Sequence, residues 1–225
     1  MPDTAIFDVD GTLVDTNYHH ALAWFRAFRR FDITLPIWHL HRAVGMGGDQ
    51  LVSHVAGDRI EREHGSALRA AHTDEFDALL AEVRPLGDAH RLLADVRSRG
   101  FRLALATSGL SAHAERSLSL IEAHSVADAR VTSDDVERTK PAPDLIHAAL
   151  AKVGGTSAVL VGDSVWDCRA AAKLDVPTVA VRTGGFSVAE LTDAGADTVF
   201  ESLPELINAL DDTPLSEATE APQPR

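Results

Sequence analysis

The chain contains little cysteine, and it has no long apolar stretch. It has 225 residues and a single cysteine, which excludes an intramolecular disulfide and is typical of proteins from a reducing compartment. No run approaches the roughly 20 consecutive apolar residues of a membrane-spanning helix. The N-terminus lacks the basic start and apolar stretch of a signal peptide. We therefore expect a soluble, cytoplasmic protein.

Positive charge is also scarce. The chain has 21 lysines and arginines against 34 aspartates and glutamates, which gives a formal net charge of −13. This excess of negative charge disfavours nucleic acids and anionic membranes as main partners. The hydrophobic content of 45% is ordinary for a globular protein, so the chain can build a sizeable core.

What the sequence does contain is a regular alternation of two patterns. Short β-branched runs alternate with amphipathic stretches, and several of the runs are apolar throughout, as in parallel strands covered on both faces. The pattern predicts an α/β fold with a doubly wound parallel sheet. The expected strands are 5–9, 102–107, 129–133, 158–163, 178–182 and 197–200, and the expected helices are 87–99, 111–121, 143–152, 166–174, 187–194 and 203–210.

One long interval breaks the alternation. Between the first strand and the run at 102–107 we expect no strand, and the spacing of apolar residues is helical. We predict a helical insert, called here the cap segment (16–82), between the two parts of a catalytic core (1–15 and 83–210). The polar tail 211–225 holds three prolines and is expected to be disordered.

Polar side chains stand where the predicted strands end. Since the carboxyl ends of parallel strands meet at one edge of the sheet, these side chains are expected to converge. Several carboxylates cannot share a small site unless a cation cancels their charge, and oxygen ligands suit Mg²⁺. A lysine and two hydroxyls beside them suit a phosphoryl group. The residues are Asp8 and Asp10, Thr107 and Ser108, Lys140, and Asp163 with Asp167.

These residues fall into four ordered stretches. They read "DVDGT" (8–12), "TS" (107–108), "KPAPD" (140–144) and "VGDSVWD" (161–167). The set resembles the four motifs of the haloacid dehalogenase superfamily, over nearly the whole chain to about residue 210. The insert after the first motif is similar to the cap of the phosphoglycolate phosphatase and β-phosphoglucomutase branch. The resemblance implies a Rossmann-like core with a helical cap.

The resemblance also implies roles for these residues. Asp8 is expected to be the nucleophile that forms an aspartyl-phosphate, with Asp10 as acid and base. Asp8, the backbone carbonyl of Asp10, and Asp163 are expected to hold Mg²⁺. Thr107, Ser108 and Lys140 would bind the phosphoryl group. Asp167 would not bind the metal directly but would orient a metal-bound water or Lys140. His20 is a possible substrate contact. We further expect that Asp8 raises the pKa of Asp10.

The implied function is a Mg²⁺-dependent phosphatase acting on a small phosphomonoester, either phosphoglycolate-like or sugar-phosphate-like. A β-phosphoglucomutase-like mutase is the first alternative. Gly47 and Gly48 stand where a mutase of this branch usually carries a basic residue that grips a second phosphate, which disfavours it. A receiver-like signalling protein or a catalytically inactive binding protein is the alternative from another class. The natural substrate and the oligomeric state stay open.

Overall fold

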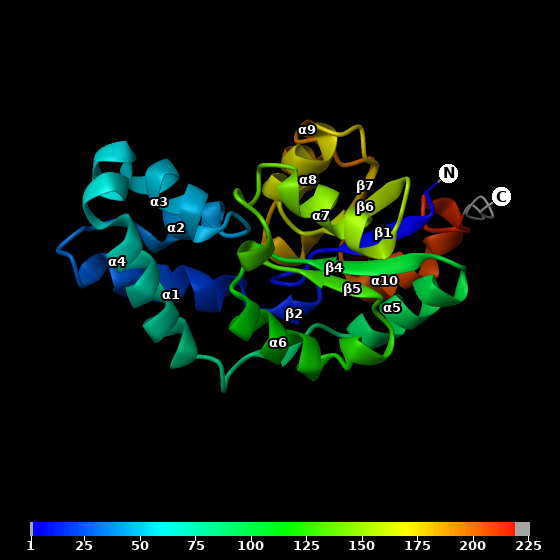
Figure 1. Ribbon diagram of the computed structural model, residues 1–225, viewed down its shortest axis with the longest axis horizontal. Helices are drawn as coiled ribbons and strands as arrows, with labels where there is room; N and C mark the ends of the chain where they lie inside the picture. Colours follow the sequence, from blue (N-terminus) through cyan, green and yellow to red (C-terminus); the bar gives the residue numbers. More distant parts are fainter. Residues whose placement is uncertain (1, 219–225) are drawn as a thin grey trace.

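The computed structural model describes residues 2–218 and contains a six-stranded, fully parallel sheet (Figure 1). The strand order is β5-β4-β1-β6-β7-β8. The expectation of a doubly wound parallel sheet is confirmed. The strands are β1 (Thr4–Phe7), β4 (Arg102–Ala106), β5 (Ala129–Val131), β6 (Ala158–Gly162), β7 (Thr178–Val181) and β8 (Thr198–Phe200).

Helices cover both faces of this sheet, and the alternation of residues along β1 shows how. Ala5 and Phe7 belong to one hydrophobic cluster and Ile6 to another, and all three are fully buried. The first cluster includes residues of α5 (Ala89–Ser98), α6 (Ser111–Leu120) and α10 (Leu203–Asn208), and the second includes residues of α7 (Asp144–Val153) and α8 (Val165–Ala172). Helix α9 (Val188–Asp193) packs beside α8. Within residues 2–218, 3₁₀ turns lie at Ala123–Ser125, Ser133–Asp135, Arg182–Gly184 and Leu210–Asp212.

The order in which the chain adds strands to the sheet reverses at β1. From β1 the chain order runs outward through β4 and β5 on one side, and through β6, β7 and β8 on the other. Ligands of doubly wound sheets bind beyond the carboxyl ends of the strands at such a switch point. The ends of β1, β4 and β6 therefore define the place to look for a site.

The cap segment contains four helices that pack mainly on one another. They are α1 (Asn17–Arg29), α2 (Ile37–Ala43), α3 (Gly48–Ala56) and α4 (Asp58–Asp77). They share a hydrophobic cluster that includes Trp24, Phe28, Leu40, Leu51 and Leu68. Figure 1 shows these four helices as a group to the left of the sheet. The boundaries 16 and 82 stay a prediction.

Two short strands lie where the chain leaves and re-enters the core. Strand β2 (Val14–Asp15) pairs with β3 (Arg84–Pro85) in antiparallel fashion. The expectation of no strand between the first strand and residue 102 is wrong for this ribbon. A strand of two residues carries no hydrophobic period, so the sequence pattern contains no signal for it.

The predicted disorder of the tail is wrong for residues 211–218. Leu215 is fully buried in the same cluster as Leu203 and Leu206 of α10. The N–H of Ala218 donates to the carbonyl of Arg99 at 3.1 Å. Leu215 and Ala218 pack on this cluster, and the polar average of the segment hides them. Residues 219–225 lie outside the described residues. Within residues 2–218, no helix combines the length and apolarity that a membrane span requires.

Candidate active site

The polar residues at the strand ends come together at the carboxyl edge of the sheet. Asp8 directly follows β1, Thr107 directly follows β4, and Asp163 directly follows β6. Asp167 lies in the first turn of α8, and Lys140 lies in the loop that precedes α7. Segments far apart in the sequence thus place their side chains around one point.

Asp8 is at the centre of this group. Its side chain is buried and one carboxylate oxygen accepts a hydrogen bond from the Lys140 ammonium. The hydroxyl of Thr12 lies 3.1 Å from the other Asp8 oxygen and 3.0 Å from an oxygen of Asp163. Thr12 therefore shares its single proton between the two carboxylates and ties them together.

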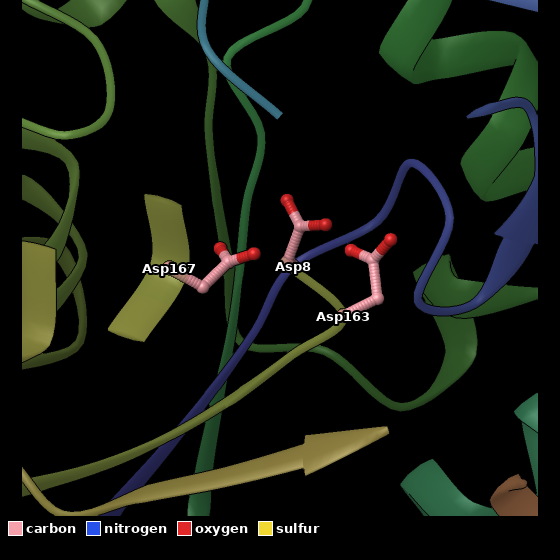
Figure 2. Close-up of side chains that lie close together, drawn as sticks. All are labelled: Asp8, Asp163 and Asp167. Carbon is pink, nitrogen blue, oxygen red and sulfur yellow. The ribbon is translucent and has the colours of Figure 1, made fainter. Parts of the chain in front are cut away.

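Three carboxylates meet here, as Figure 2 shows for Asp8, Asp163 and Asp167. Each offers an oxygen that lies within 4.8 Å of the others. Asp163 also accepts from the side-chain amide of Asn17 at 2.8 Å. Asp167 accepts from the Ser164 hydroxyl at 2.6 Å and lies 2.8 Å from Lys140.

The charge of this cluster is not balanced by protein groups. Burial raises the pKa of Asp8 well above its ordinary value, although the charge of Lys140 acts against this. Burial, with the neighbouring Asp167, raises the pKa of Asp163 to about 7. The pKa of Lys140 is raised because Asp167 and Asp8 outweigh the effect of its burial. One buried ammonium thus faces three carboxylates, and a hard cation with oxygen ligands fits the remaining charge.

Asp10 lies in a different setting, which corrects one expectation. It accepts from the hydroxyls of Thr107 at 2.7 Å and Thr16 at 3.0 Å, and His20 Nε2 lies 3.6 Å from it. Burial acts to raise the pKa of Asp10, but His20, Thr107 and Thr16 outweigh it and the pKa lies below its ordinary value. The expectation of a raised pKa is wrong for this arrangement, since donors to the carboxylate outweigh the neighbouring negative charge.

His20 joins Asp10 to the cap segment. Its Nδ1 lies 3.2 Å from Nε2 of His72 on α4, and its ring stacks on Phe76 with the centroids 3.9 Å apart. Burial, followed by the charges of His20 and His113, lowers the pKa of His72 well below its ordinary value. His72 is therefore a neutral partner that orients the His20 ring toward Asp10.

Ser108 also contacts the cap segment. Its hydroxyl donates to the carbonyl of Gly45 at 3.2 Å, while the neighbouring Thr107 hydroxyl accepts from the N–H of Gly109 at 2.9 Å. Ser108 stands beside the cluster, as expected from the motif, and its hydroxyl is engaged by the cap loop in this structure. Its role in binding phosphate stays a prediction.

A cavity of about 220 Å³ opens over the cluster between the core and the cap segment. Asp8, Asp10 and Lys140 line it from the core. The cap segment contributes apolar and polar groups to its wall, among them His20, Trp24, Asp49, Arg69, His72 and Thr73. A small molecule bound here is in contact with both parts of the chain.

Sequence reasoning missed several of these residues. Thr12 lies within the first motif, four residues after Asp8, so its place in the motif was an available signal. Asn17, at the start of α1, donates a hydrogen bond to Asp163. Gly11 leaves room for this contact, since a Cβ on Gly11 would lie 2.1 Å from the Asn17 amide and 2.4 Å from the Asp163 carboxylate. Arg69 and His72 lie in an amphipathic helix with no motif around them.

Comparison with known proteins agrees with this geometry. The family model of the haloacid dehalogenase-like hydrolases matches residues 5–181, well over half of the chain. The chain belongs to the haloacid dehalogenase-like hydrolase family. The match begins in β1 and ends at the last residue of β7, so it spans the three strand ends that form the site.

Individual relatives cover most of the chain. A phosphoglycolate phosphatase of Caulobacter vibrioides is 31% identical over 207 residues, 88% of this chain and 86% of its own. The pyrophosphatase PpaX of Bacillus velezensis is 27% identical over 215 residues, 90% of this chain and 94% of its own. The crystal structure of a hydrolase from Pseudomonas syringae superimposes with a TM-score of 0.87 at 32% identity, covering 93% of this chain and 98% of that one.

Proposed function

We propose that this protein is a Mg²⁺-dependent phosphatase that hydrolyses a small phosphomonoester through an aspartyl-phosphate on Asp8. The enzyme class follows from the family and from its phosphatase relatives. The observation that carries the proposal is the position of Asp8, buried between Lys140 and Asp163 on the wall of the cavity. A carboxylate in this place can act as a nucleophile, because it lies beside the Lys140 ammonium and beside the proposed Mg²⁺ site.

Asp8, Asp163 and the backbone carbonyl of Asp10 are the proposed Mg²⁺ ligands. The unbalanced charge of the carboxylates supports this choice. Asp167 is held by Ser164 and Lys140, so we assign it the role of supporting the ligands and the lysine rather than binding the metal. When bound, Mg²⁺ supplies charge neutralisation to the phosphoryl oxygens and to Asp8.

The chain's own residues carry the two chemical steps. First, an Asp8 oxygen attacks phosphorus, the bond to the leaving oxygen breaks, and that oxygen takes a proton from Asp10. Second, water attacks phosphorus, the bond to Asp8 breaks, and Asp10 takes the water's proton as orthophosphate leaves. Thr107 and Lys140, with Ser108, hold the phosphoryl oxygens throughout.

The first step requires a proton on Asp10, and the Thr107 contact suggests how Asp10 acquires it. In this structure Thr107 donates to Asp10 at 2.7 Å, one of the contacts that lower the pKa of Asp10. A bound phosphoryl oxygen competes for the same hydroxyl. When Thr107 turns to the phosphoryl group, Asp10 loses a donor and its affinity for a proton rises.

Arg69 favours a substrate with a second negative charge. Among the described residues that line the cavity, Arg69 and Lys140 are the two with a permanent positive charge. Arg69 Nη1 donates to Gly48 O at 3.1 Å and to Glu61 at 2.9 Å. Its Nε and Nη2 have no protein partner within residues 2–218, which leaves donors for a carboxylate or a second phosphate.

The class of substrate that we propose is therefore a small phosphomonoester with a carboxylate, of which phosphoglycolate is the simplest. The names of the Caulobacter and Bacillus relatives refer to substrates with two anionic groups. The mutase remains the alternative: the cap loop has no basic residue at Gly47 or Gly48, but Arg69 lines the cavity beside it. A Cβ on Gly48 would lie 2.9 Å from Cγ of Arg69, so the loop is already filled by the arginine.

The test is phosphate release from phosphoglycolate, pyrophosphate and uncharged-alcohol phosphates, with Mg²⁺ and with a chelator. We expect turnover that needs both the metal and Asp8, and a best kcat/KM for the carboxylated ester. Arg69→Leu should raise KM for phosphoglycolate by roughly 10- to 100-fold, the value of a charged hydrogen bond, and change KM for an uncharged-alcohol phosphate little.

Other outcomes identify the alternatives. A protein that binds Mg²⁺ but releases no phosphate from any ester contradicts the proposal. Movement of phosphate within a sugar bisphosphate would then indicate a mutase, and a single labelling event that persists would indicate a receiver-like switch. A cytoplasmic location, expected from the lone cysteine, stays a prediction.

A further inference from the structure

The cap segment reaches the core at the residue directly before Lys140. The N–H of Gly47 donates to the hydroxyl of Thr139 at 3.0 Å, and the N–H of Thr139 donates to Asp49 at 3.1 Å. The Thr139 hydroxyl in turn donates to the other oxygen of Asp49. Thr139 is buried, and both its hydroxyl and its backbone N–H are therefore satisfied by the cap segment.

The sequence of the cap loop makes this approach possible. A Cβ on Gly47 would lie 2.2 Å from the Thr139 hydroxyl and 2.7 Å from Asp49. No side chain fits in that space, so residue 47 must be glycine while the loop is docked. Asp49 lies in the first turn of α3 and is exposed, which suits a contact that forms and breaks.

Lys140 is held on both sides of its place in the chain. On one side, Lys173 donates to the carbonyl of Pro141 at 2.7 Å, a contact made within the core. On the other side, Thr139 is held by Asp49 from the cap segment. The Lys140 ammonium between these anchors is buried against Asp8 and Asp167. The two residues that flank Lys140 are thus held by a core contact on one side and a cap contact on the other.

We propose that Asp49 is a positioning residue for Lys140. By binding the hydroxyl and N–H of Thr139, Asp49 fixes the lysine loop only while the cap segment is docked. The lysine is then in place when the cavity is closed to bulk water and is displaced when the cap segment lifts. The inference rests on the proposed phosphatase activity for its kinetic consequence, but its structural consequence is independent of activity.

The kinetic test compares Asp49→Ala with wild type. We expect kcat to fall by roughly 10- to 100-fold, the effect of a displaced catalytic group, with KM within about 3-fold of wild type because Asp49 does not itself hold the phosphoryl group. Asp58→Ala is the matched control. Asp58 is the first-turn acid of the next cap helix, and its side chain bonds Ser53 within the cap segment.

Variants of Thr139 test whether Asp49 acts through it. Thr139→Val should lower kcat, as Asp49→Ala does. Thr139→Ser keeps the hydroxyl and should retain most of the wild-type activity. If the two residues share one contact, Asp49→Ala/Thr139→Val is no slower than Asp49→Ala alone. Effects that multiply in the double variant would show that Asp49 acts by another route and would overturn the proposal.

A third readout does not depend on activity. The chain has three lysines, and an amine reagent followed by mass spectrometry reports on each. In wild type, buried Lys140 should be protected, while Lys152, with a 40% exposed side chain, reacts and serves as the internal control. In Asp49→Ala we expect Lys140 to react at least about 10-fold faster, since a group held buried is modified only from an opened state, with the Lys152 rate unchanged.

The outcomes are separable. Absence of turnover in wild type contradicts the proposed function, and the Lys140 labelling rate still decides the positioning role. Turnover in wild type with unchanged kcat and unchanged Lys140 protection in Asp49→Ala overturns the positioning role alone. If Asp49→Ala fails to fold, Asp49→Asn, which keeps the size but cannot accept both bonds, gives the same comparison.

Discussion

The two ends of strand β1 carry buried carboxylates in opposite settings. At the amino end, Asp3 accepts from the hydroxyl of Thr4 at 2.7 Å and from the N–H and hydroxyl of Thr156 at 3.0 and 2.8 Å. Arg102 lies 3.1 Å away. Burial acts to raise the pKa of Asp3, but these hydrogen bonds outweigh it and the pKa lies below its ordinary value.

At the carboxyl end the balance is reversed. Asp8 has one cation, Lys140, which it shares with Asp167, and a neighbouring carboxylate, Asp163. Its pKa is raised by burial in spite of the lysine. The same strand thus has a carboxylate with several donors at one end, and at the other end carboxylates whose charge the described protein groups leave unbalanced, as expected of a ligand site.

The largest expected effect is the loss of activity in Asp8→Asn. Removing the nucleophile should lower kcat by roughly 10⁴-fold or more, measured as phosphate release with Mg²⁺ present. Asp3→Asn is the matched control, since it removes a buried aspartate from the opposite end of the same strand. Activity retained in Asp8→Asn within tenfold of wild type would contradict the role of Asp8.

Next in size is the effect of metal on stability. Bound Mg²⁺ should stabilise the wild-type protein by about 2.7 kcal/mol at 100 times its Kd, a rise in Tm of roughly 5 to 10 °C for a chain of this size. Asp163→Asn should lose most of this rise because one carboxylate ligand is gone. Asp3→Asn should keep it. Equal metal-induced shifts in all three proteins would show that the carboxylate cluster does not bind the metal.

Asp3→Asn is expected to act on stability alone. Replacing a buried carboxylate that accepts several hydrogen bonds should lower the free energy of unfolding by about 1 to 3 kcal/mol. Chemical denaturation at pH 7 measures this change, and kcat should stay unchanged. The pKa of Asp3 is lowered in the folded protein, so its stabilising effect is present above the unfolded pKa and disappears as the pH falls through the folded one. Wild type and Asp3→Asn should therefore converge in acid.

The smallest effect concerns Cys168, next to Asp167 on α8. The thiol is fully buried, and burial, followed by the charge of Asp167, raises its pKa to about 12. A disulfide reagent at pH 8 should leave the native protein unmodified and react once it is unfolded, because the thiolate is the reactive form. Rapid modification of the folded protein would show that the carboxyl edge is more open, or less negative, than described.

The sequence predicted the parts of the fold that are marked by apolar runs or by a helical spacing of apolar residues. All six strands of the sheet lie within or close to the runs expected from the alternation, because buried parallel strands are apolar throughout. It did not predict the β2–β3 ribbon, which is too short for any period, or the packing of Leu215, which depends on a partner far away in the chain. Long-range partners also decided the site. The motif indicated Asp8 and Lys140, but only the fold brings Arg69, His72 and Asp49 to the cavity wall.

The lowered pKa of Asp10 illustrates the same limit. Its distance along the chain from Asp8 suggested repulsion between the two carboxylates. The groups that prevail are His20 and Thr16 at the start of α1 and Thr107 after β4. A sequence motif names the groups present, and tertiary contacts decide their state of protonation.

The most direct test of this account is the Tm of Asp3→Asn and Asp8→Asn, measured side by side at pH 7 with metal removed. We expect the two changes in Tm to have opposite signs. Asp3→Asn should have a Tm several degrees below that of wild type. Asp8→Asn should have a Tm at or above that of wild type, because the substitution removes a buried carboxyl group whose pKa is raised in the folded protein. A fall in Tm for Asp8→Asn as large as that for Asp3→Asn would contradict the claim that the carboxyl edge is held in an unbalanced state for its ligand.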